Sequence, residues 1–303
     1  MIQPILAITG GTGFVGATLV RHAVMRGHQV RALTRKPQPS SGKVTWVDGA
    51  LDDQQSLARL VDGADAVIHV AGAINARDRA GFEVANVVGT LNVIEAAKAA
   101  GVQRFIHVSS LAAREPDLSD YGWSKARSEQ VVGASGLNWT VVRPPAVYGP
   151  GDRETLELFK MAKRGLVFLP PPGKLSVIEV SDLSRFLLTL IRHDETYGET
   201  YEPDDGYELG WTHRQFAEAI GMAVGHRHIA TFSTPRALMR LGARIDRLLR
   251  GRRAKLTLDR AAYFSHPDWV AMARPPSDLW RPHIETHAGL RATAIAYKAA
   301  GWL

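Results

Sequence analysis

The sequence predicts an α/β protein built on a doubly wound parallel sheet, followed by a smaller mixed domain. Short apolar runs alternate with helical segments through the first half of the chain, which is typical of parallel strands joined by crossover helices. A glycine-rich turn joins the first apolar run to the first helical segment. After Gly151 the alternation weakens, and this change marks the expected start of the second domain.

The expected elements follow one another along the first half of the chain. Six short runs rich in aliphatic residues are expected to be strands, at residues 5–8, 29–33, 44–47, 66–70, 104–108 and 139–142. Segments with helical spacing are expected at residues 17–26, 54–61, 82–100 and 121–132. Glycines at 27 and 101 end two of these helices, as is common at helix C-termini. Because helices separate most of the strands, the sheet is expected to be parallel.

The first strand-to-helix turn carries the strongest functional signal. Its glycines fall at positions 10, 11, 13 and 16, between an apolar strand and a helical segment. Glycine allows the sharp turn, lets a pyrophosphate approach the backbone and lets helix and strand pack closely. The helix N-terminus adds free N–H groups and a partial positive charge. A dinucleotide pyrophosphate is therefore expected to lie against Gly10, Gly13, Phe14, Val15 and Gly16.

The expected domain boundaries follow from this pattern. Residues 1–150 are assigned to a nucleotide-binding domain of the Rossmann type, to which residues 176–197 are expected to return. Residues 177–190 in particular are expected to rejoin the main sheet, with Asp182 as a helix cap. Residues 151–175 and 198–303 are assigned to the smaller, substrate-side domain, which is expected to end in a helix over residues 293–300.

Composition narrows the class of protein. The 303 residues include 45% hydrophobic and 22% charged residues, which is ordinary for a globular chain of one large or two modest domains. No apolar run is long enough to span a membrane, and no signal peptide is expected before the first strand. The chain has no cysteine, which excludes disulfides, thiolate metal sites and a cysteine nucleophile. A cytoplasmic protein is expected on these grounds.

The net charge of +7 is confined to one segment of the chain. Residues 236–255 hold eight basic residues and one acid, so the rest of the chain is neutral. Because no nucleic-acid-binding motif accompanies them, no nucleic-acid partner is expected. Apolar residues at helical spacing predict an amphipathic helix over residues 236–249, and the favoured interpretation is a basic face exposed to solvent. A membrane surface and an anionic group on the substrate are the alternatives.

The end of the second expected strand indicates which nucleotide is bound. A fold that prefers NAD usually has a carboxylate about 20 residues after the glycines, where it binds the ribose hydroxyl. This chain has Thr34, Arg35 and Lys36 there, and cations of this kind pair well with a phosphate. NADP is therefore expected as the cofactor, with NAD as the alternative. Asp48, after the third strand, is a weaker candidate for the adenine edge.

A tyrosine and a lysine are candidates for the chemical step. Tyr121 and Lys125 are four residues apart on an expected helix and therefore share one face. A nearby ammonium is expected to lower the pKa of the phenol, which can then exchange a proton with a substrate hydroxyl or carbonyl. Ser110 follows the fifth strand, at the edge where parallel sheets bind ligands, and can hydrogen-bond the reacting oxygen.

Together these segments resemble the extended or atypical branch of the short-chain dehydrogenase/reductase superfamily. This branch includes nucleotide-sugar epimerases and dehydratases, dihydroflavonol-type reductases and hydroxysteroid dehydrogenases. The resemblance covers most of the first 200 residues. It is carried by residues 9–16, 69–72, 86–90, 109–110 and 143–151, and by Tyr121 with Lys125.

The resemblance implies a role for each matching residue. Tyr121 would be the catalytic acid and base, Lys125 would bind the nicotinamide ribose and tune Tyr121, and Ser110 would orient the substrate oxygen. Asn86 would support the helix packing behind the site. The cofactor cleft would also be lined by Leu51, Val70, Ala71, Gly72 and Pro144.

Two departures from the family pattern bear on the activity. Gly49-Ala50-Leu51 stands where the family often has Gly-Asp-Leu, so the adenine contact of that Asp must come from elsewhere. The acids that follow the serine in dehydratases are replaced by Leu111 and Ala112, which argues against a sugar 4,6-dehydratase.

The expected activity is hydride transfer between the nicotinamide and a small-molecule secondary alcohol or carbonyl. The alternatives are a nucleotide-sugar epimerase that retains NAD, and a non-catalytic NADP-binding subunit or sensor. The retained Tyr121 and Lys125 favour an enzyme. A homodimer is a candidate assembly. No metal site is expected, because His226 and His228 lack the spacing and the carboxylate neighbours of metal ligands.

Overall fold

The chain folds into two compact units in the computed structural model, which describes residues 4–39, 42–251 and 257–303. The first unit comprises Met1–Arg143, Leu183–Glu202 and Pro275–Trp280. The second comprises Pro144–Asp182, Pro203–Arg274 and Arg281–Leu303. Each unit therefore draws on several separate stretches of the chain.

A seven-stranded parallel sheet forms the centre of the first unit. Its strands are β1 (Ile5–Thr9), β2 (Gln29–Thr34), β3 (Val44–Asp48), β4 (Ala66–His69), β5 (Arg104–Val108), β6 (Asn138–Val142) and β11 (Glu199–Tyr201). They lie in the order β11-β6-β5-β4-β1-β2-β3, and each neighbouring pair is parallel. The predicted doubly wound parallel fold is confirmed. Because the strand order reverses between β1 and β4, ligands are expected beyond the carboxyl ends of these two strands.

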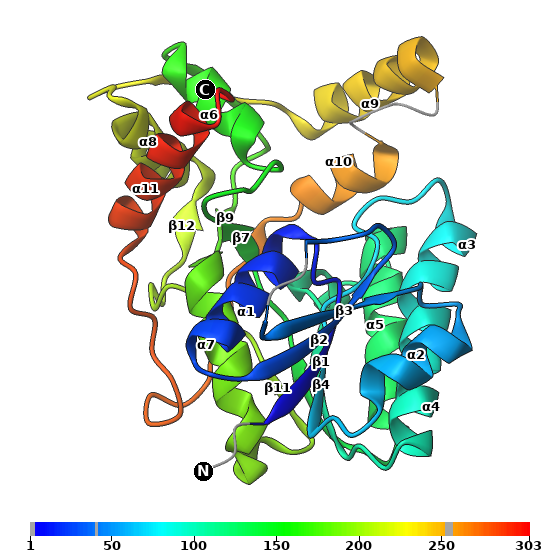
Figure 1. Cartoon of the computed structure of the whole chain (residues 1–303). Coiled ribbons are helices and arrows are strands. Elements are labelled where there is room, and N and C mark those ends of the chain that lie inside the picture. The colour runs from blue at the N-terminus through cyan, green and yellow to red at the C-terminus, as the bar shows by residue number, and fades with distance from the viewer. Residues whose placement is uncertain (1–3, 40–41, 252–256) are drawn as a thin grey trace. The chain divides into compact units, whose positions relative to one another are not determined.

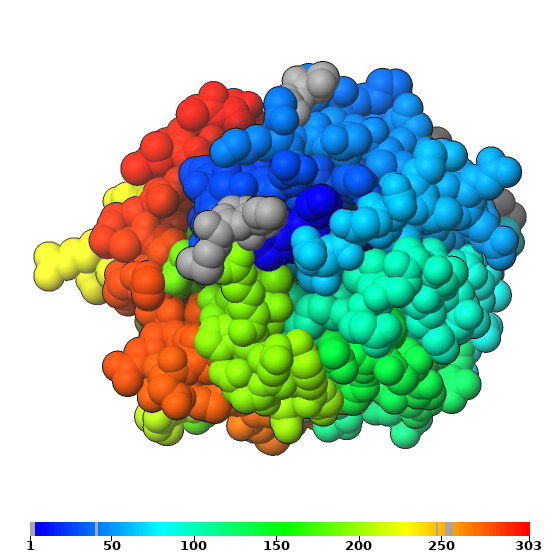
Figure 2. All heavy atoms as spheres, turned by 60° about the horizontal axis from the view of Figure 1, so that its bottom comes forward, coloured from blue at the N-terminus to red at the C-terminus, as the bar shows by residue number. Residues whose placement is uncertain are grey.

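Helices cover both faces of this sheet (Figure 1). They are α1 (Phe14–Met25), α2 (Gln54–Val61), α4 (Gly89–Ala99), α5 (Asp120–Gly133) and the part of α7 (Val180–Thr189) from Leu183 onward. Leu57 of α2, Val93 of α4 and Val132 of α5 are fully buried in one apolar cluster with Phe105 of β5. Short 3-10 turns lie at Leu111–Arg114, Leu190–Arg192 and Asp194–Thr196. Residues 183–202 form part of the surface at the end where the strands begin (yellow-green in Figure 2).

Two elements of the first unit differ from the prediction. The helix predicted over residues 82–100 is divided into α3 (Arg79–Phe82), a π-helical turn (Glu83–Val88) and α4. A π-helical turn inserts a residue into the helix, which helical spacing in a sequence does not reveal. Residues 177–190 add no strand to the main sheet, and the returning strand is β11. This strand has three residues, too few for a periodic pattern to identify it.

Small sheets and helices make up the second unit, which is mixed, as predicted. β7 (Ala146–Tyr148) pairs with β10 (Val177–Glu179), β8 (Leu166–Leu169) pairs with β13 (Ala230–Ser233), and β9 (Lys174–Leu175) lies between β12 (Trp211–Thr212) and β14 (Asp268–Trp269). Its helices are α6 (Leu156–Lys163), α8 (His213–Val224), α9 (Arg236–Arg250), α10 (Leu258–Phe264) and α11 (Thr286–Ala299). Tyr148, Phe159, Phe216 and Tyr297 are the aromatic part of its core.

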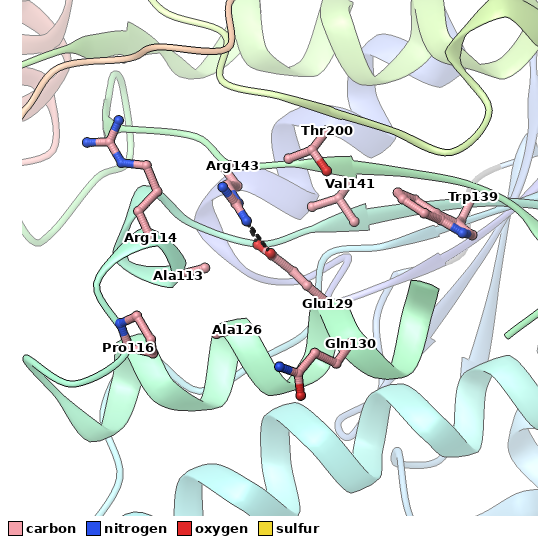
Figure 3. Close-up of a pocket in the computed structure, with 10 residues that line it drawn as sticks. All are labelled: Ala113, Arg114, Pro116, Ala126, Glu129, Gln130, Trp139, Val141, Arg143 and Thr200. Atoms are coloured by element: carbon pink, nitrogen blue, oxygen red, sulfur yellow. Dashed lines mark hydrogen bonds and ion pairs between the residues drawn. The ribbon is translucent and has the colours of Figure 1, made fainter. Parts of the chain in front are cut away.

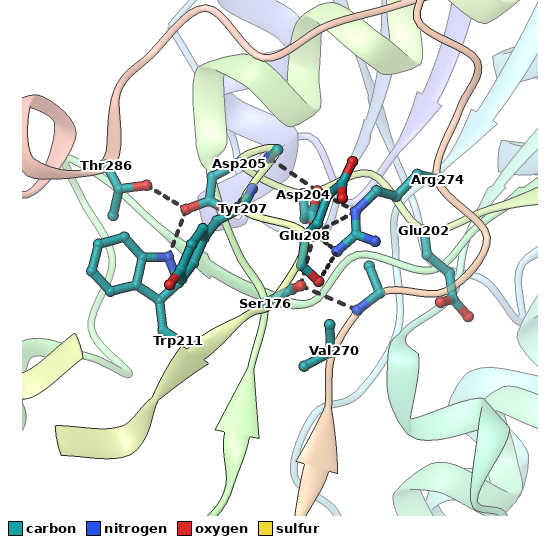
Figure 4. A network of polar contacts seen from close by, with 12 residues as sticks. Ser176, Glu202, Asp204, Asp205, Tyr207, Glu208, Trp211, Val270, Arg274 and Thr286 are labelled. Atoms are coloured by element: carbon teal, nitrogen blue, oxygen red, sulfur yellow. Dashed lines mark hydrogen bonds and ion pairs between the residues drawn. The ribbon is translucent and has the colours of Figure 1, made fainter. Parts of the chain in front are cut away.

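Two neighbouring aspartates join distant stretches of the second unit (Figure 4). Asp204 accepts a hydrogen bond from Ser176 Oγ at 2.7 Å and others from the Arg274 guanidinium at 2.7–3.1 Å. Asp205 accepts from Thr286 Oγ1 at 2.6 Å. Hydrogen bonds to ionised groups are stronger than neutral ones, so these contacts hold the loops before α8 and α11 in place.

Asp182 does not cap α7, in contrast to the prediction. It is the third residue of α7, which begins at Val180. Its Oδ2 accepts from the backbone N–H groups of His283 and Ile284, both at 2.9 Å. The carboxylate therefore anchors the segment before α11, a long-range contact that local sequence spacing cannot predict.

Candidate active site

The turn from β1 to α1 leaves no room for side chains at two of its glycines. Gly10 has a φ of +72°, and a Cβ there would lie 2.8 Å from the backbone nitrogen of Ala71. A Cβ on Gly16 would lie 2.0 Å from the carbonyl oxygen of Gly10. The N-cap of α1 is Gly13, which has no side chain to accept from the first turn. That turn consists of Phe14, Val15 and Gly16. A narrow backbone cradle thus ends at an uncapped helix N-terminus, which suits a phosphate.

The ends of β2 and β3 lie beside this turn in the sheet. Thr34 is in register with Asp48, the last residue of β3. Thr34 Oγ1 donates to the carbonyl oxygen of Lys36 at 2.6 Å, which shapes the turn after β2. The side chains of Arg35, Lys36 and Asp48 are exposed. Two cations and one carboxylate are therefore available at the carboxyl ends of these strands.

A chain of hydrogen bonds joins the ends of β1 and β4. Thr9 Oγ1 lies 2.7 Å from His69 Nδ1 and accepts from the N–H of Ala71 at 3.1 Å. His69 Nε2 lies 3.0 Å from Thr90 Oγ1. Burial, with a smaller contribution from Lys125, lowers the pKa of His69 to about 3, so this histidine is neutral. The loop Val70, Ala71 and Gly72 is therefore fixed against the glycine turn.

Two further candidates for the cofactor cleft have different surroundings. Leu51 is partly buried, and a Cβ on Gly89 would lie 2.8 Å from its Cδ1. Its carbonyl oxygen accepts from Asn92 Nδ2 at 2.8 Å, so Leu51 packs against the start of α4. Pro144 is buried and is the first residue of the second unit.

Ser110 and Tyr121 are brought together from separate elements. Ser110 follows β5 and caps the 3-10 turn, where its Oγ accepts from the N–H of Ala112 at 3.2 Å. Tyr121 is in the first turn of α5, and its side chain is hydrogen-bonded to that of Ser110. Burial raises the pKa of Tyr121, and the hydrogen bond with Ser110 opposes this rise. The pKa direction is opposite to the one expected from Lys125, because the loss of hydration outweighs the other effects.

Lys125 lies one helical turn after Tyr121. Its Nζ donates to the carbonyl oxygen of Val108 at 2.8 Å and would lie 3.7 Å from a Cβ on Gly72. Burial lowers the pKa of Lys125 to about 8, and the negative charge of Glu129 opposes the shift. The ammonium is therefore held at the carboxyl ends of β4 and β5, on the same helix as the phenol.

Asn86 links the loop after β4 to α5. Its Oδ1 accepts from the N–H of Ala73 at 2.7 Å, and its Nδ2 donates to the carbonyl oxygen of Ala73 at 3.0 Å. Nδ2 also donates to Ser124 Oγ at 2.8 Å. Ser124 is one residue from Lys125, so Asn86 fixes the distance between the Gly72 loop and the lysine.

Sequence reasoning missed a polar network behind the serines. Ser109 Oγ donates to Glu129 Oε1 at 2.5 Å, which leaves Ser110 as the serine that meets Tyr121. Arg143 binds the Glu129 carboxylate through Nε at 2.9 Å and through a terminal nitrogen at 2.6 Å. Glu129 is four residues after Lys125, so helical spacing was the available signal for its place on the same face.

An open pocket of about 610 Å³ adjoins this network (Figure 3). Arg143 and Glu129 point toward each other in the pocket wall, between α5 and β6. The Glu202 carboxylate forms ion pairs with two arginines. Its Oε2 lies 3.2 Å from Nη1 of Arg114, and its Oε1 lies 3.6 Å from Nη1 of Arg143. The rest of the lining is Ala113, Pro116, Ala126, Gln130, Trp139, Val141 and Thr200. Because its arginines are paired with carboxylates, the pocket has no unbalanced charge to draw an anion.

The arrangement can move a proton to or from an oxygen beside a dinucleotide. A phenol, a hydroxyl and an ammonium gather where β4 and β5 end, and the glycine turn lies at the end of the neighbouring β1. Such a set is suited to acid–base catalysis on a carbonyl or a hydroxyl. Within the described residues, no group of three or more metal-binding side chains is present.

Comparison with known proteins identifies a nucleotide-binding family and two reductases that resemble this chain in sequence. Residues 10–194 match the model of a family described as NAD(P)H-binding. A ceramide reductase of Caulobacter vibrioides is 36% identical, over 99% of this chain and 96% of that protein. A 2-alkyl-3-oxoalkanoate reductase of Stenotrophomonas maltophilia is 31% identical, over 94% of this chain and 97% of that protein.

A solved structure shares the fold at low identity. The Bordetella bronchiseptica enzyme WbmG, in complex with NAD and UDP, superposes with a TM-score of 0.76 at 19% identity. The superposition covers 100% of this chain and 97% of WbmG. This likeness establishes the architecture, whereas the two reductases are similar in sequence along nearly their whole length.

Proposed function

The chain belongs to the NAD(P)H-binding family, in the extended branch of the short-chain dehydrogenases/reductases, and on this premise we propose that it reduces a ketone with NADPH. That the chain is a nicotinamide-dependent enzyme follows from the family and from its reductase relatives. In the proposed reaction a hydride adds to the carbonyl carbon and a proton adds to the carbonyl oxygen, which yields a secondary alcohol. The observation that carries the proposal is the hydrogen-bonded pair Ser110 and Tyr121, with Lys125 one turn along α5.

The residues present fit a nicotinamide dinucleotide. Side chains at Gly10 and Gly16 would fill the cradle in front of α1, so glycine keeps it open for a pyrophosphate. Arg35 and Lys36 would bind a 2′-phosphate, which NADP has and NAD lacks. When bound, NADPH supplies the hydride, and Lys125 would hold its ribose.

Tyr121 would act as the acid in the reduction. Its raised pKa keeps the phenol protonated at neutral pH, as a proton donor must be. As the carbonyl oxygen gains negative charge, Ser110 would donate a hydrogen bond to it and Tyr121 would give up its proton. With a pKa of about 8, Lys125 is mostly cationic at neutral pH, so its charge would stabilise the phenolate that forms.

The substrate class proposed is a ketone that carries alkyl chains. Two relatives that match nearly the whole chain are named as reductases of ceramide and of 2-alkyl-3-oxoalkanoates. The second name describes a 3-oxo group between an alkyl chain and a carbon that carries an alkyl branch and a carboxylate. A hydride and a proton-donating tyrosine would reduce this oxo group to a hydroxyl. The whole-length match includes the second unit, where substrate specificity is expected.

A comparison of substrates and cofactors tests this proposal. The purified protein would be incubated with NADPH or NADH and a panel of 3-oxo compounds of increasing chain length, and nicotinamide absorbance would be followed. We expect turnover with NADPH that increases with chain length. Turnover with nucleotide sugars, together with NAD that stays bound through purification, would support the epimerase alternative and contradict the proposal.

A further inference from the structure

Helix α9 turns its larger apolar face away from the second unit. It contacts α10 through Met239 and Ala243, which form a small buried cluster with Ala261. Five other apolar residues of the helix are between 47% and 85% exposed: Leu238, Leu241, Ile245, Leu248 and Leu249. Their spacing of three and four residues places them in one stripe along the helix. The stripe that usually faces a core is therefore uncovered in this unit.

The charged residues of the same helix are mostly basic. Arg236, Arg240, Arg244 and Arg250 are exposed along it. Its only acid, Asp246, lies 3.3 Å from Arg250 and is paired with it. The basic segment continues in the sequence with Arg252, Arg253 and Lys255, which lie outside the described residues. The surroundings that suit this helix must be both apolar and anionic.

We propose that α9 docks this protein on an anionic membrane surface. The leucine stripe would enter the boundary between acyl chains and headgroups, and the arginines would contact lipid phosphates. A second copy of the chain is a poorer occupant, because it would cover the apolar stripe but would bring two helices of net positive charge together with no anion to offset them. Among the described helices, none is both long and apolar enough to span a bilayer. In this proposal α9 would lie in the plane of the membrane surface.

This inference goes beyond the proposed reductase activity and does not depend on it. The stripe and the arginines belong to α9 in the second unit, whereas Ser110, Tyr121 and Lys125 belong to the first. A membrane site would bring the enzyme to lipid-borne ketones, which have low solubility in water. Binding to a membrane can nevertheless be measured without any turnover.

Vesicle flotation tests the proposal. The full chain would be mixed with vesicles of phosphatidylcholine alone, or of phosphatidylcholine with phosphatidylglycerol. We expect binding to the anionic vesicles only, weakened by added salt. Arg240→Gln with Arg244→Gln should weaken the binding about 25-fold, since each basic residue near a charged surface contributes about fivefold. Leu248→Gln with Leu249→Gln should weaken it at least about tenfold, because two apolar side chains leave the lipid.

Ile295→Gln is the matched control. Ile295 is 67% exposed on α11, outside the proposed docking helix, and its replacement should leave vesicle binding unchanged. All variants should keep the melting temperature and the turnover of a water-soluble ketone. Equal binding to neutral vesicles, or full binding by the leucine variant, would overturn the proposal. So would a dimer that the leucine variant abolishes, because the stripe would then belong to a second copy.

Discussion

The side chain of Tyr121, at the start of α5, is hydrogen-bonded to that of Ser110, which follows β5. Burial raises the pKa of Tyr121, and this bond opposes the rise. The buried Lys125 follows one turn later with a pKa of about 8. A protonated phenol beside a cation is the state that a carbonyl reduction requires.

Replacement of Ser110 tests the role of this hydrogen bond. In Ser110→Ala the pKa of Tyr121 should rise further, and the reacting oxygen should lose a donor. We expect kcat for ketone reduction to fall about 10²-fold, the usual effect of losing one such donor. Ser109→Ala is the matched control, because Ser109 donates to Glu129 instead, and it should change kcat by less than about threefold. Equal losses in the two variants would contradict the assignment.

Replacement of Glu129 should change both the pH profile of activity and the stability of the protein, because its carboxylate interacts with Lys125 and with Arg143. Its negative charge raises the pKa of Lys125, so in Glu129→Gln that pKa should fall and the pH profile of kcat should move to lower pH. Arg143 would lose the nearer of its two carboxylate partners and keep Glu202, which should cost about 2 kcal/mol of unfolding free energy. Glu218→Gln breaks an exposed pair with Arg214 and should cost less than about 0.5 kcal/mol. A pH profile identical to that of the wild type would contradict the proposed coupling.

The lowered pKa of Lys125 should make the stability of the protein depend on pH. Burial lowers its pKa from 10.5 to about 8 in the folded chain. Between these values the unfolded chain binds a proton that the folded chain does not, so the free energy of unfolding should rise with pH, by about 3 kcal/mol. Lys125→Met should lose this rise, and Lys98→Met, at an exposed position on α4, should keep it. Urea unfolding at several pH values measures the free energy of unfolding of each protein. Wild type and Lys125→Met would show the same pH dependence if Lys125 were hydrated, and this result would contradict the prediction.

Arg35 tests the choice of nucleotide. In Arg35→Gln a guanidinium that would bind the 2′-phosphate is lost, so NADP should bind about tenfold more weakly. NAD has no such phosphate, and its affinity should change by less than about twofold. Lys43→Gln removes another exposed cation, just before β3 and at the other end of the strands, and is the control. Titration by fluorescence measures both affinities, and an equal loss for both nucleotides would contradict the assignment.

The fold could be predicted largely from local patterns. The strands before residue 143 are short aliphatic runs, and the β1–α1 turn requires glycines for steric reasons that hold in any such fold. The predictions for Asp182 and for the strand that returns to the main sheet failed, because both features depend on contacts between residues far apart in the sequence. Asp182 binds backbone groups about a hundred residues away, and β11 is an edge strand of only three residues. Neither leaves a periodic signal in the sequence.

In the candidate site too, local spacing could be predicted from the sequence, whereas features that depend on tertiary contacts could not. The spacing of Tyr121 and Lys125 was visible because four residues make about one helical turn. The pKa direction of Tyr121 was not visible, because it depends on how much of the phenol the fold buries. Arg143 and its carboxylate partners Glu129 and Glu202 come from separate elements, so their ion pairs are a product of the tertiary structure.

The central claim is that Tyr121 supplies the proton for an NADPH-dependent reduction. Tyr121→Phe removes only the phenolic oxygen, so the most direct measurement compares NADPH oxidation by ketone with NADPH affinity in this variant. We predict that turnover falls at least about 10³-fold while the Kd for NADPH changes by less than about threefold. Turnover within tenfold of the wild type, with the fold and the NADPH affinity intact, would contradict the account.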